Sequence, residues 1–318
     1  MRCSIVIPTC NREQVLLDTV AALIGLDRRA AELLVVDQTA EHEPRTQSHL
    51  REREAAGQLR WLRMSPPSIV GALNAGLREA RGDIVLFLDD DIVPGADLVA
   101  AHEAAHVQHP EAWAVAGQVL QPGESPCGAG ARGPRCGLRS DLLFRFAASD
   151  GEWVENVMAG NLSVKRERAL AAGGFDANFT PPVAFRFETE FARRVCRAGG
   201  RVWFEPSASV RHLRAPSGGT RSHGGHLASA SPVHGVGDYY YALVCGRGWE
   251  RLTYMARRPF REVATRFHLR HPWWIPAKFV GESRAIGQAW RLYRGGPRLL
   301  SVEGAGGATA GPAPEAAA

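Results

Sequence analysis

The feature that most constrains the fold is a short apolar run, Ile84–Leu88, followed at once by Asp89, Asp90 and Asp91. The run is too short for an independent helix and predicts a buried strand. The acids then stand at the carboxyl end of a strand, where open α/β sheets bind their ligands. Because side chains alternate along an extended chain, Asp89 and Asp91 point to one side and Asp90 to the other.

Neighbouring carboxylates of this kind repel each other unless one is protonated or a cation lies between them. Mg2+ or Mn2+, which prefer oxygen ligands, would relieve that repulsion and could hold a diphosphate. An ordinary solvated acidic loop is the alternative interpretation.

Strand and helix patterns alternate along the first two thirds of the chain. Apolar runs predict strands at 4–7, 33–36, 59–62, 84–88 and 113–119, with shorter strands at 201–204 and 208–212. Amphipathic segments predict helices at 11–26, 72–80, 96–109 and 187–198. This alternation is typical of an α/β fold with a mixed, mostly parallel sheet flanked by helices.

The composition is that of a globular protein, with 45% hydrophobic and 22% charged residues over 318 positions. This length allows one large α/β domain with an appendage. The chain opens directly on a strand rather than on a secretory signal, and no apolar run approaches the length of a membrane span. The six cysteines are scattered without a CxxC pair. We therefore expect a cytoplasmic protein with reduced thiols.

The first strand is followed by Pro8-Thr9-Cys10-Asn11-Arg12, which fits neither the GxGxxG nor the Walker pattern. Rossmann dehydrogenases and P-loop proteins are therefore excluded.

Several motifs in order resemble those of family-2 glycosyltransferases. They are Ser4–Arg12 (SIVIPTCNR), Val35–Asp37, Asn74–Gly76, Arg81–Asp91 (RGDIVLFLDDD), Gly160–Val164, Gly173–Asp176, Glu188–Phe191 with Arg194, and His212. The resemblance covers about residues 3–221. It implies the Rossmann-like GT-A fold, which binds a nucleotide-diphosphate sugar donor and a divalent metal.

The resemblance implies donor-binding roles at matching positions. Pro8, Thr9 and Arg12 would line the nucleoside pocket, and Asp37 would accept a hydrogen bond from the base. Asn74 lies in a further donor-binding motif, although Leu73 stands where the family often has arginine.

Asp89 and Asp91 match the DxD motif of the family, in which the first acid reaches ribose or metal and the last holds the metal. Asp90 and Asn161 are expected to contribute to donor binding, and Asn161 could equally cap a turn. His212 ends a strand and is a candidate third ligand for Mg2+ or Mn2+, although a lone histidine is more often structural.

The resemblance also implies a catalytic base at the start of a helix, and Glu188 is our candidate. Inverting transfer needs a carboxylate that takes the proton of the acceptor hydroxyl. Glu190 has Arg193 and Arg194 at helix-surface ion-pair spacing, whereas the same spacing from Glu188 reaches Phe191 and Ala192. A position in the first helical turn favours a negative charge. The alternative is an ordinary N-terminal helix acid.

The segment after His212 is rich in glycine and serine and predicts a loop that could close over the donor. Arg214 or Arg221 could then reach the diphosphate. A plain linker has the same composition.

Two other classes of protein compete with this interpretation. His102, Glu103 and His106 fit the HExxH pattern of zinc proteases. The metzincin extension fails, because His109 and Ala112 occupy its glycine and third-histidine positions, so coincidence is favoured. The other alternative is a GT-A-like protein that binds a nucleotide sugar without turnover.

Residues 236–300 form a basic segment with twelve Lys/Arg against four acids, interleaved with aromatic residues. Helices packed on the GT-A domain are favoured, and peripheral docking on an anionic membrane is the open alternative. Nucleic acid is not expected as a partner, since no recognition motif accompanies the charge.

The predicted organisation is a GT-A domain at 1–221, a flexible loop at 222–235, a basic helical extension at 236–300 and a disordered tail at 301–318. The predicted function is inverting, metal-dependent transfer of a sugar from a nucleotide-diphosphate sugar to an acceptor hydroxyl. A glycan, a lipid-linked molecule or a small molecule could carry that hydroxyl. The location is cytoplasmic, with peripheral attachment at the inner face of the membrane left open.

Overall fold

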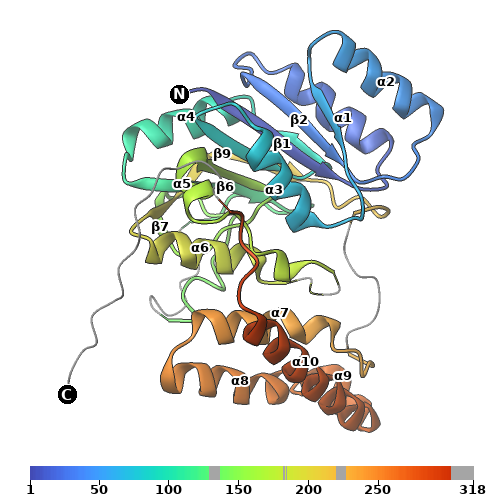
Figure 1. Cartoon of the computed structure of the whole chain (residues 1–318), viewed down its shortest axis with the longest axis vertical. Helices are drawn as coiled ribbons and strands as arrows, with labels where there is room; N and C mark the ends of the chain where they lie inside the picture. Colours follow the sequence, from blue (N-terminus) through green and yellow to red (C-terminus); the bar gives the residue numbers. More distant parts are fainter. Residues whose placement is uncertain (129–136, 182, 184, 220–226, 302–318) are drawn as a thin grey trace.

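A computed structural model of the chain describes residues 1–301 except 129–136, 182, 184 and 220–226. It has a twisted sheet covered by helices and, at one end, a group of C-terminal helices (Figure 1). The strands are β1 (Cys3–Thr9), β2 (Glu32–Asp37), β3 (Arg60–Arg63), β4 (Ile84–Leu88), β5 (Ile92–Pro94), β6 (Ala112–Leu120), β7 (Glu152–Val154), β8 (Asn161–Lys165) and β9 (Arg201–His212). The helices are α1 (Gln14–Ile24), α2 (Pro44–Ala55), α3 (Ile69–Glu79), α4 (Leu98–Gln108), α5 (Arg166–Ala171), α6 (Phe187–Arg197), α7 (Val233–Cys245), α8 (Gly248–Val263), α9 (Arg266–Arg270) and α10 (Ile275–Gly295), with short 3-10 turns η1 (Ala177–Phe179) and η2 (Pro272–Trp274).

The strand order of the sheet is β3-β2-β1-β4-β8-β6-β9-β5, and β7 pairs with β9. Strands β1 to β4, β6 and β9 run in one direction, whereas β5, β7 and β8 run in the other. The mostly parallel α/β sheet that the sequence predicts is therefore confirmed. The order reverses between β1 and β4, and a ligand-binding crevice is expected outside the carboxyl ends of strands at such a switch point.

The two strands at that switch point lie in the core. Every residue of β1 and β4 is buried, which explains why both read as nearly continuous apolar runs. They pair in parallel, with Val6 opposite Phe87. This register brings the end of β1, at Thr9, beside the acidic segment that follows β4.

Two features of the fold differ from the prediction. The helix α2 has no counterpart in the prediction, because only Thr46 and Leu50 of its residues are buried and its apolar stripe is too thin to recognise. The two strands predicted at 201–204 and 208–212 form one strand, β9, interrupted by a register shift against Gly117 and Gln118 of β6. Pro206 lies inside that irregular stretch, so the proline marks a bulge rather than a strand end.

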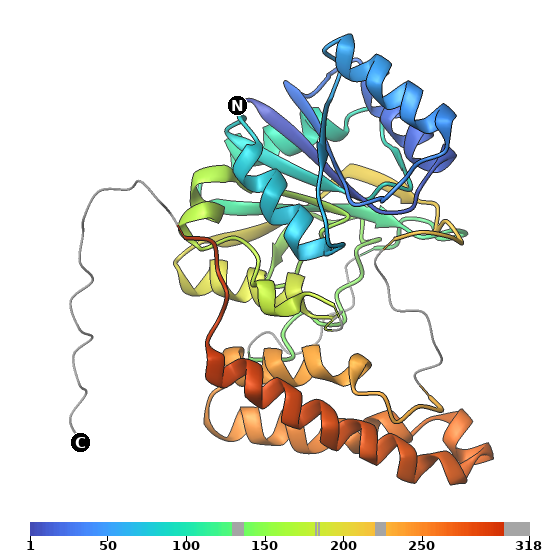
Figure 2. The same cartoon turned by 45° about the vertical axis from the view of Figure 1, so that its right-hand side comes forward.

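The C-terminal extension consists of α7 to α10 and packs beneath the sheet domain (Figure 2). The predicted loop at 222–235 ends earlier than expected, because α7 already begins at Val233. Beyond α10 the chain returns to the sheet domain, where the Leu300 N–H donates to the Gly173 carbonyl at 2.8 Å. The predicted tail, apart from Ser301, and residues 222–226 of the predicted loop lie outside the described residues.

Among the helices in the described part of the chain, none combines the length and the apolar character needed to cross a membrane.

Candidate active site

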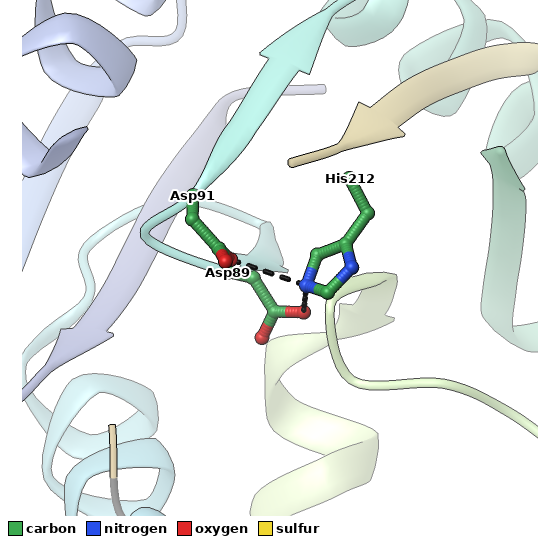
Figure 3. Close-up of side chains that lie close together, drawn as sticks. All are labelled: Asp89, Asp91 and His212. Atoms are coloured by element: carbon green, nitrogen blue, oxygen red, sulfur yellow. Dashed lines mark ion pairs between the residues drawn. The ribbon is translucent and has the colours of Figure 1, made fainter. Parts of the chain in front are cut away.

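Three side chains able to hold a metal ion converge at the end of β4 (Figure 3). The His212 Nε2 lies 3.1 Å from Asp91 Oδ1 and 3.7 Å from Asp89 Oδ2. One ligand atom from each of the three residues lies within 4.8 Å of the others, and the described residues contain no second group of three or more His, Cys, Asp or Glu that meets this condition.

The sheet itself delivers the histidine to the acids. His212 is the last residue of β9 and pairs with Ile92, the first residue of β5, so it stands next to Asp91. The Leu213 N–H donates to the Asp91 carbonyl at 2.8 Å and fixes the two chain segments beyond the ladder. A contact between residues this far apart in sequence therefore follows from strand pairing.

The other ring nitrogen of His212 is held by Gln121. His212 Nδ1 lies 3.2 Å from Gln121 Oε1, which also accepts from Arg214 Nε at 2.8 Å. Because arginine only donates, that atom of Gln121 is the amide oxygen, and Nδ1–H donates to it. Nε2 faces the two carboxylates, and one imidazole nitrogen with two carboxylate oxygens is a donor set that fits a divalent cation such as Mn2+.

The environment of Asp91 favours its charged form. Burial alone would raise its pKa, but hydrogen bonds from His212 and from the Ala215 N–H, with Arg12 nearby, lower the pKa below its ordinary value. An ionised carboxylate is the form that binds a metal.

Asp90 lies on the opposite side from Asp89 and Asp91, as alternation predicts. Its Oδ2 accepts from Thr9 Oγ1 at 2.7 Å, and its Oδ1 lies 3.3 Å from Arg12 Nε. Burial raises the pKa of Asp90 to about 7, against the lowering effects of Thr9 and Arg12. Thr9 and Arg12 therefore hold the acidic segment in place.

The loop after β9 is held against the same arginine. Arg12 Nη1 donates to the carbonyls of Ala215, at 3.2 Å, and Ser217, and the Gly219 N–H donates to the Cys10 carbonyl at 2.7 Å. Gly218 has a φ of +80°, and a Cβ there would lie 2.3 Å from the Asn11 carbonyl oxygen, so only glycine fits. The described part of this loop is thus already packed beside Asp91.

Two arginines are predicted to reach the diphosphate, and the structure describes one of them, Arg214, beside His212. Arg214 is engaged by Gln121. Arg221 lies outside the described residues.

Three of the predicted donor-binding residues have their polar groups committed within the protein. Asp37 is fully buried, and it accepts from the Thr39 N–H at 2.8 Å and from Trp61 Nε1 at 2.9 Å, with His42 Nε2 also 2.9 Å away. Asn74 exchanges two 2.8 Å hydrogen bonds with the backbone of Phe175. These contacts account for the polar groups of Asp37 and Asn74 within the fold, and their role in donor binding stays a prediction.

Asn161 is likewise fully buried and donates to the carbonyls of Gln118 and Ala208 at 3.0 and 2.7 Å. It connects β8, β6 and β9 rather than facing an open surface. Pro8, the remaining predicted pocket residue, is a buried member of β1. The internal contacts of Asn161 and the burial of Pro8 are enough to explain why these residue types stand at these positions.

The HExxH segment lies on α4 and is used for packing. His102 Nε2 lies 2.8 Å from Asn161 Oδ1 and its Nδ1 lies 2.8 Å from Ser163 Oγ, while His106 Nε2 lies 2.9 Å from the same Oγ. Glu103 pairs with Arg28 at 2.6 Å. Both imidazoles are buried against β8, which supports coincidence over a zinc site.

Glu188 lies in the first turn of α6 and contacts the segment that supports Asp89. Its Oε1 accepts from the Ala159 N–H at 2.7 Å. The next residue, Gly160, packs so closely on Asp89 that a Cβ would lie 2.2 Å from Oδ2. Glu188 and Asp89 therefore contact consecutive residues of one segment, Ala159 and Gly160, which lies between the candidate base and the metal-binding group.

Glu190, the alternative acid on this helix, pairs with Arg194 at 2.7 Å as the spacing predicts. The pair is not on the surface, however, because Glu190 is buried, and Arg193 instead pairs with Glu155. The residue just before the helix is Arg186, a non-glycine residue with a φ of 76° that pairs with Asp238 of α7 at 2.6 Å. Backbone strain of this kind is often found beside functional sites.

An open cleft of about 550 Å3 lies beside Glu188. One wall is apolar and is formed by the segments before and after β7. The opposite wall comes from the C-terminal extension. The apolar wall consists of Leu142, Phe144, Phe146, Val157 and Met158, and the extension contributes His234, Asp238, Arg258, Arg261 and Glu262. Sequence reasoning missed this cleft, Gln121 and the close approach of Gly160, since no local pattern signals contacts across the fold.

Comparison with known proteins identifies the class of this fold. Similar solved structures include GalNAc-T7 with UDP, GalNAc and Mn2+ (TM-score 0.58, 16% identity, 76% of this chain and 50% of that chain). TarS from S. aureus is also similar (0.55, 12%, 84% and 45%). So is the mannosyltransferase PcManGT from Pyrobaculum calidifontis in complex with GDP-Man and Mn2+ (0.52, 19%, 92% and 79%). The chain therefore has the GT-A fold of glycosyltransferases, as the sequence resemblance predicts.

Residues 4–126 match the family model of glycosyl transferase family 2. The acidic segment lies inside the match, whereas Glu188 and His212 lie outside it. No curated protein sequence matches the chain. The chain spans about half the length of the first two structures.

Proposed function

We propose that the protein is a metal-dependent glycosyltransferase that moves a sugar from a nucleotide-diphosphate donor to an acceptor hydroxyl with inversion. The observation that carries the proposal is the position of Glu188 beside the segment that packs on Asp89. A carboxylate next to a diphosphate-metal site is the arrangement that single-step displacement needs. The family match and the nucleotide-bound and Mn2+-bound neighbours support the same class of reaction.

Asp89, Asp91 and His212 would hold Mg2+ or Mn2+, and the ion when bound would neutralise charge on the leaving diphosphate. The donor is proposed to lie along the end of β4, under the loop held by Arg12. Arg12 and Thr9 fix the acidic segment through Asp90, so they would act by positioning.

Glu188 would accept the proton of the acceptor hydroxyl as that oxygen attacks the anomeric carbon. The Ala159 N–H and the start of α6 both interact favourably with its negative charge. The cleft beside Glu188 is the proposed acceptor site, because Glu188 lines it and an acceptor bound there would lie against the base. A cytoplasmic location stays a prediction.

The test compares Glu188→Gln with the parent and with Glu190→Gln, the same change two residues along the helix. Release of nucleoside diphosphate is measured over a panel of nucleotide sugars and acceptors with Mn2+, and donor affinity is measured by calorimetry. For Glu188→Gln we expect the rate to fall about a hundredfold to ten-thousandfold with donor affinity kept. Glu190→Gln is expected to lower the melting temperature instead, because it weakens a buried ion pair.

An unchanged rate in Glu188→Gln would refute its role as the base. A parent protein that binds a nucleotide sugar but releases no product with any acceptor would support the alternative, a binding protein without turnover.

A further inference from the structure

The aromatic residues of the C-terminal extension fall on two different faces. Tyr239, Tyr240 and Tyr241 of α7 are fully buried against the sheet domain and α10. In contrast, Trp249 is 80% exposed and Trp273 is 66% exposed. Packing on the domain explains the tyrosines, but it does not explain the tryptophans.

The exposed residues form a continuous stripe. Trp249, Leu252, Ala256 and Phe260 are spaced three or four residues apart on α8, so they share one face, and all four are exposed. The opposite face of α8 carries the buried Tyr254 and Arg258, which contact Asp238 of α7.

The stripe extends from α8 onto the neighbouring helix α10. The Phe260 ring lies 5.9 Å from the ring of Phe279. Val280 and Trp290 of α10 are also about half exposed, at 45% and 49%.

The acids of the extension are used internally. Asp238 and Glu282 pair with Arg258, and Glu262 pairs with Arg261 and lies 3.8 Å from Lys278. The remaining acid, Glu250, accepts from the Leu138 N–H. Most of the negative charge of the extension is therefore neutralised by ion pairs within the extension itself.

The exposed cations of the extension are arginines. They are Arg247, Arg257, Arg261, Arg266, Arg270, Arg284, Arg291, Arg294 and Arg298. Within the described part of the chain, Arg261 is the one member of this set with a carboxylate ion pair. The exposed surface of the extension thus carries aromatic side chains and many arginines, of which Arg261 faces the cleft beside Glu188.

We propose that this outer face of α8, η2 and α10 docks on an anionic lipid bilayer. Helices with Trp and Leu on one face and Arg on the flanks bind at the headgroup level, where aromatic rings enter the interface and arginines meet acidic headgroups. The docking is peripheral. It does not depend on the proposed transfer reaction.

The geometry also orients the catalytic domain. Figure 1 shows α7 between the sheet domain and α8, so docking through α8 holds the sheet domain away from the bilayer. Arg261 and Glu262 of α8 line the cleft beside Glu188. The cleft would then lie near the membrane, within reach of a hydroxyl carried on a lipid headgroup.

The experiment is co-sedimentation of the full chain with vesicles. Vesicles of phosphatidylglycerol and phosphatidylcholine are compared with vesicles of phosphatidylcholine alone, at low and high salt. The parent is expected to bind the anionic vesicles and to dissociate at high salt. A double variant, Arg291→Glu with Arg294→Glu, is expected to bind these vesicles at least about tenfold more weakly. Each basic residue near an anionic membrane raises the binding constant by roughly fivefold.

The matched control is Arg45→Glu with Arg51→Glu, which reverses two exposed arginines on α2 and is expected to leave vesicle binding unchanged. A second variant, Trp249→Ser with Phe260→Ser, tests the aromatic stripe at two mostly exposed side chains and is expected to weaken binding to anionic vesicles. Quenching of tryptophan fluorescence by brominated lipid is expected in the parent. Equal binding by parent and Arg291→Glu/Arg294→Glu, absence of vesicle binding in the parent, or salt-sensitive binding of RNA in place of vesicles would overturn the proposal.

Discussion

Gly160 offers a sharp test of how Asp89 is positioned. A Cβ at this residue would lie 2.2 Å from Asp89 Oδ2 and 2.8 Å from its Cγ. An ordinary carbon–oxygen contact is about 3.3 Å, so in Gly160→Ala the carboxylate must move by about 1 Å. Metal-ligand distances tolerate deviations of only about 0.2 Å, so the displaced carboxylate no longer reaches a shared ion.

The expected loss in Mn2+ affinity is about tenfold to a hundredfold, equivalent to ~1.4–2.8 kcal/mol. Folding stability should change little, because Gly160 has no left-handed φ and the displaced group is the partly exposed end of a side chain. Mn2+ affinity is measured by calorimetry and stability by thermal unfolding without metal.

Gly287→Ala is the matched control, because the same methyl group there meets no atom within 4 Å. It is expected to leave Mn2+ affinity unchanged and to raise helix stability by about 0.5–1 kcal/mol. If Gly160→Ala binds Mn2+ as tightly as the parent while remaining folded, Asp89 is not a metal ligand and the inferred site is wrong.

Three further predictions concern groups that support the fold. Asn74→Ala removes two buried hydrogen bonds to Phe175, so the free energy of unfolding, measured with denaturant, should fall by about 2 kcal/mol while Mn2+ affinity is kept. Loss of nucleotide affinity at unchanged stability would contradict this and indicate that Asn74 binds the donor. Burial lowers the pKa of the His102 imidazole to about 4, whereas the same imidazole in the unfolded chain is protonated below about pH 6.5. The free energy of unfolding should therefore be highest above pH 6.5 and fall by about 3 kcal/mol as the pH drops to 4. Urea titrations of parent and His102→Gln check this, and an equal pH slope in both would contradict it. Asp238→Asn removes the buried carboxylate that pairs with both Arg186 and Arg258, and Arg258 keeps only its pairs with glutamates. The change should cost about 3 kcal/mol, read from chemical unfolding, whereas the exposed Asp97→Asn should cost almost nothing. Equal stability of the two variants would show that the Asp238 carboxylate is dispensable.

The strands at the switch point could be predicted from sequence because their environment is uniform. β1 and β4 are buried on both faces, so an apolar run is the only pattern that such strands can carry. The position of Asp89, Asp90 and Asp91 followed from strand alternation, which is a local property. The pairing of His212 with these acids needed the register of β5 and β9, which no local pattern encodes.

The partners of the predicted donor-binding residues, in contrast, could not be predicted from the sequence. A motif records which residue type stands at a position, but it does not record which partner uses the polar groups. Asn161 and Asn74 satisfy backbone groups of β6, β9 and Phe175, and their amides look the same in sequence as amides that bind a ligand. The helix α2 was missed for a related reason, since a mostly exposed helix leaves little apolar periodicity.

The return of the chain to the sheet domain after α10 has a mechanical consequence. The Arg298 N–H donates to Asp176 Oδ1 and the Leu300 N–H to Gly173, while α7 is held at its other end by Arg186. The extension is therefore anchored at both of its ends, and a segment fixed twice cannot swing like a tail. The walls of the cleft beside Glu188 that come from the sheet domain and from the extension are therefore held in a fixed relation by contacts on both sides.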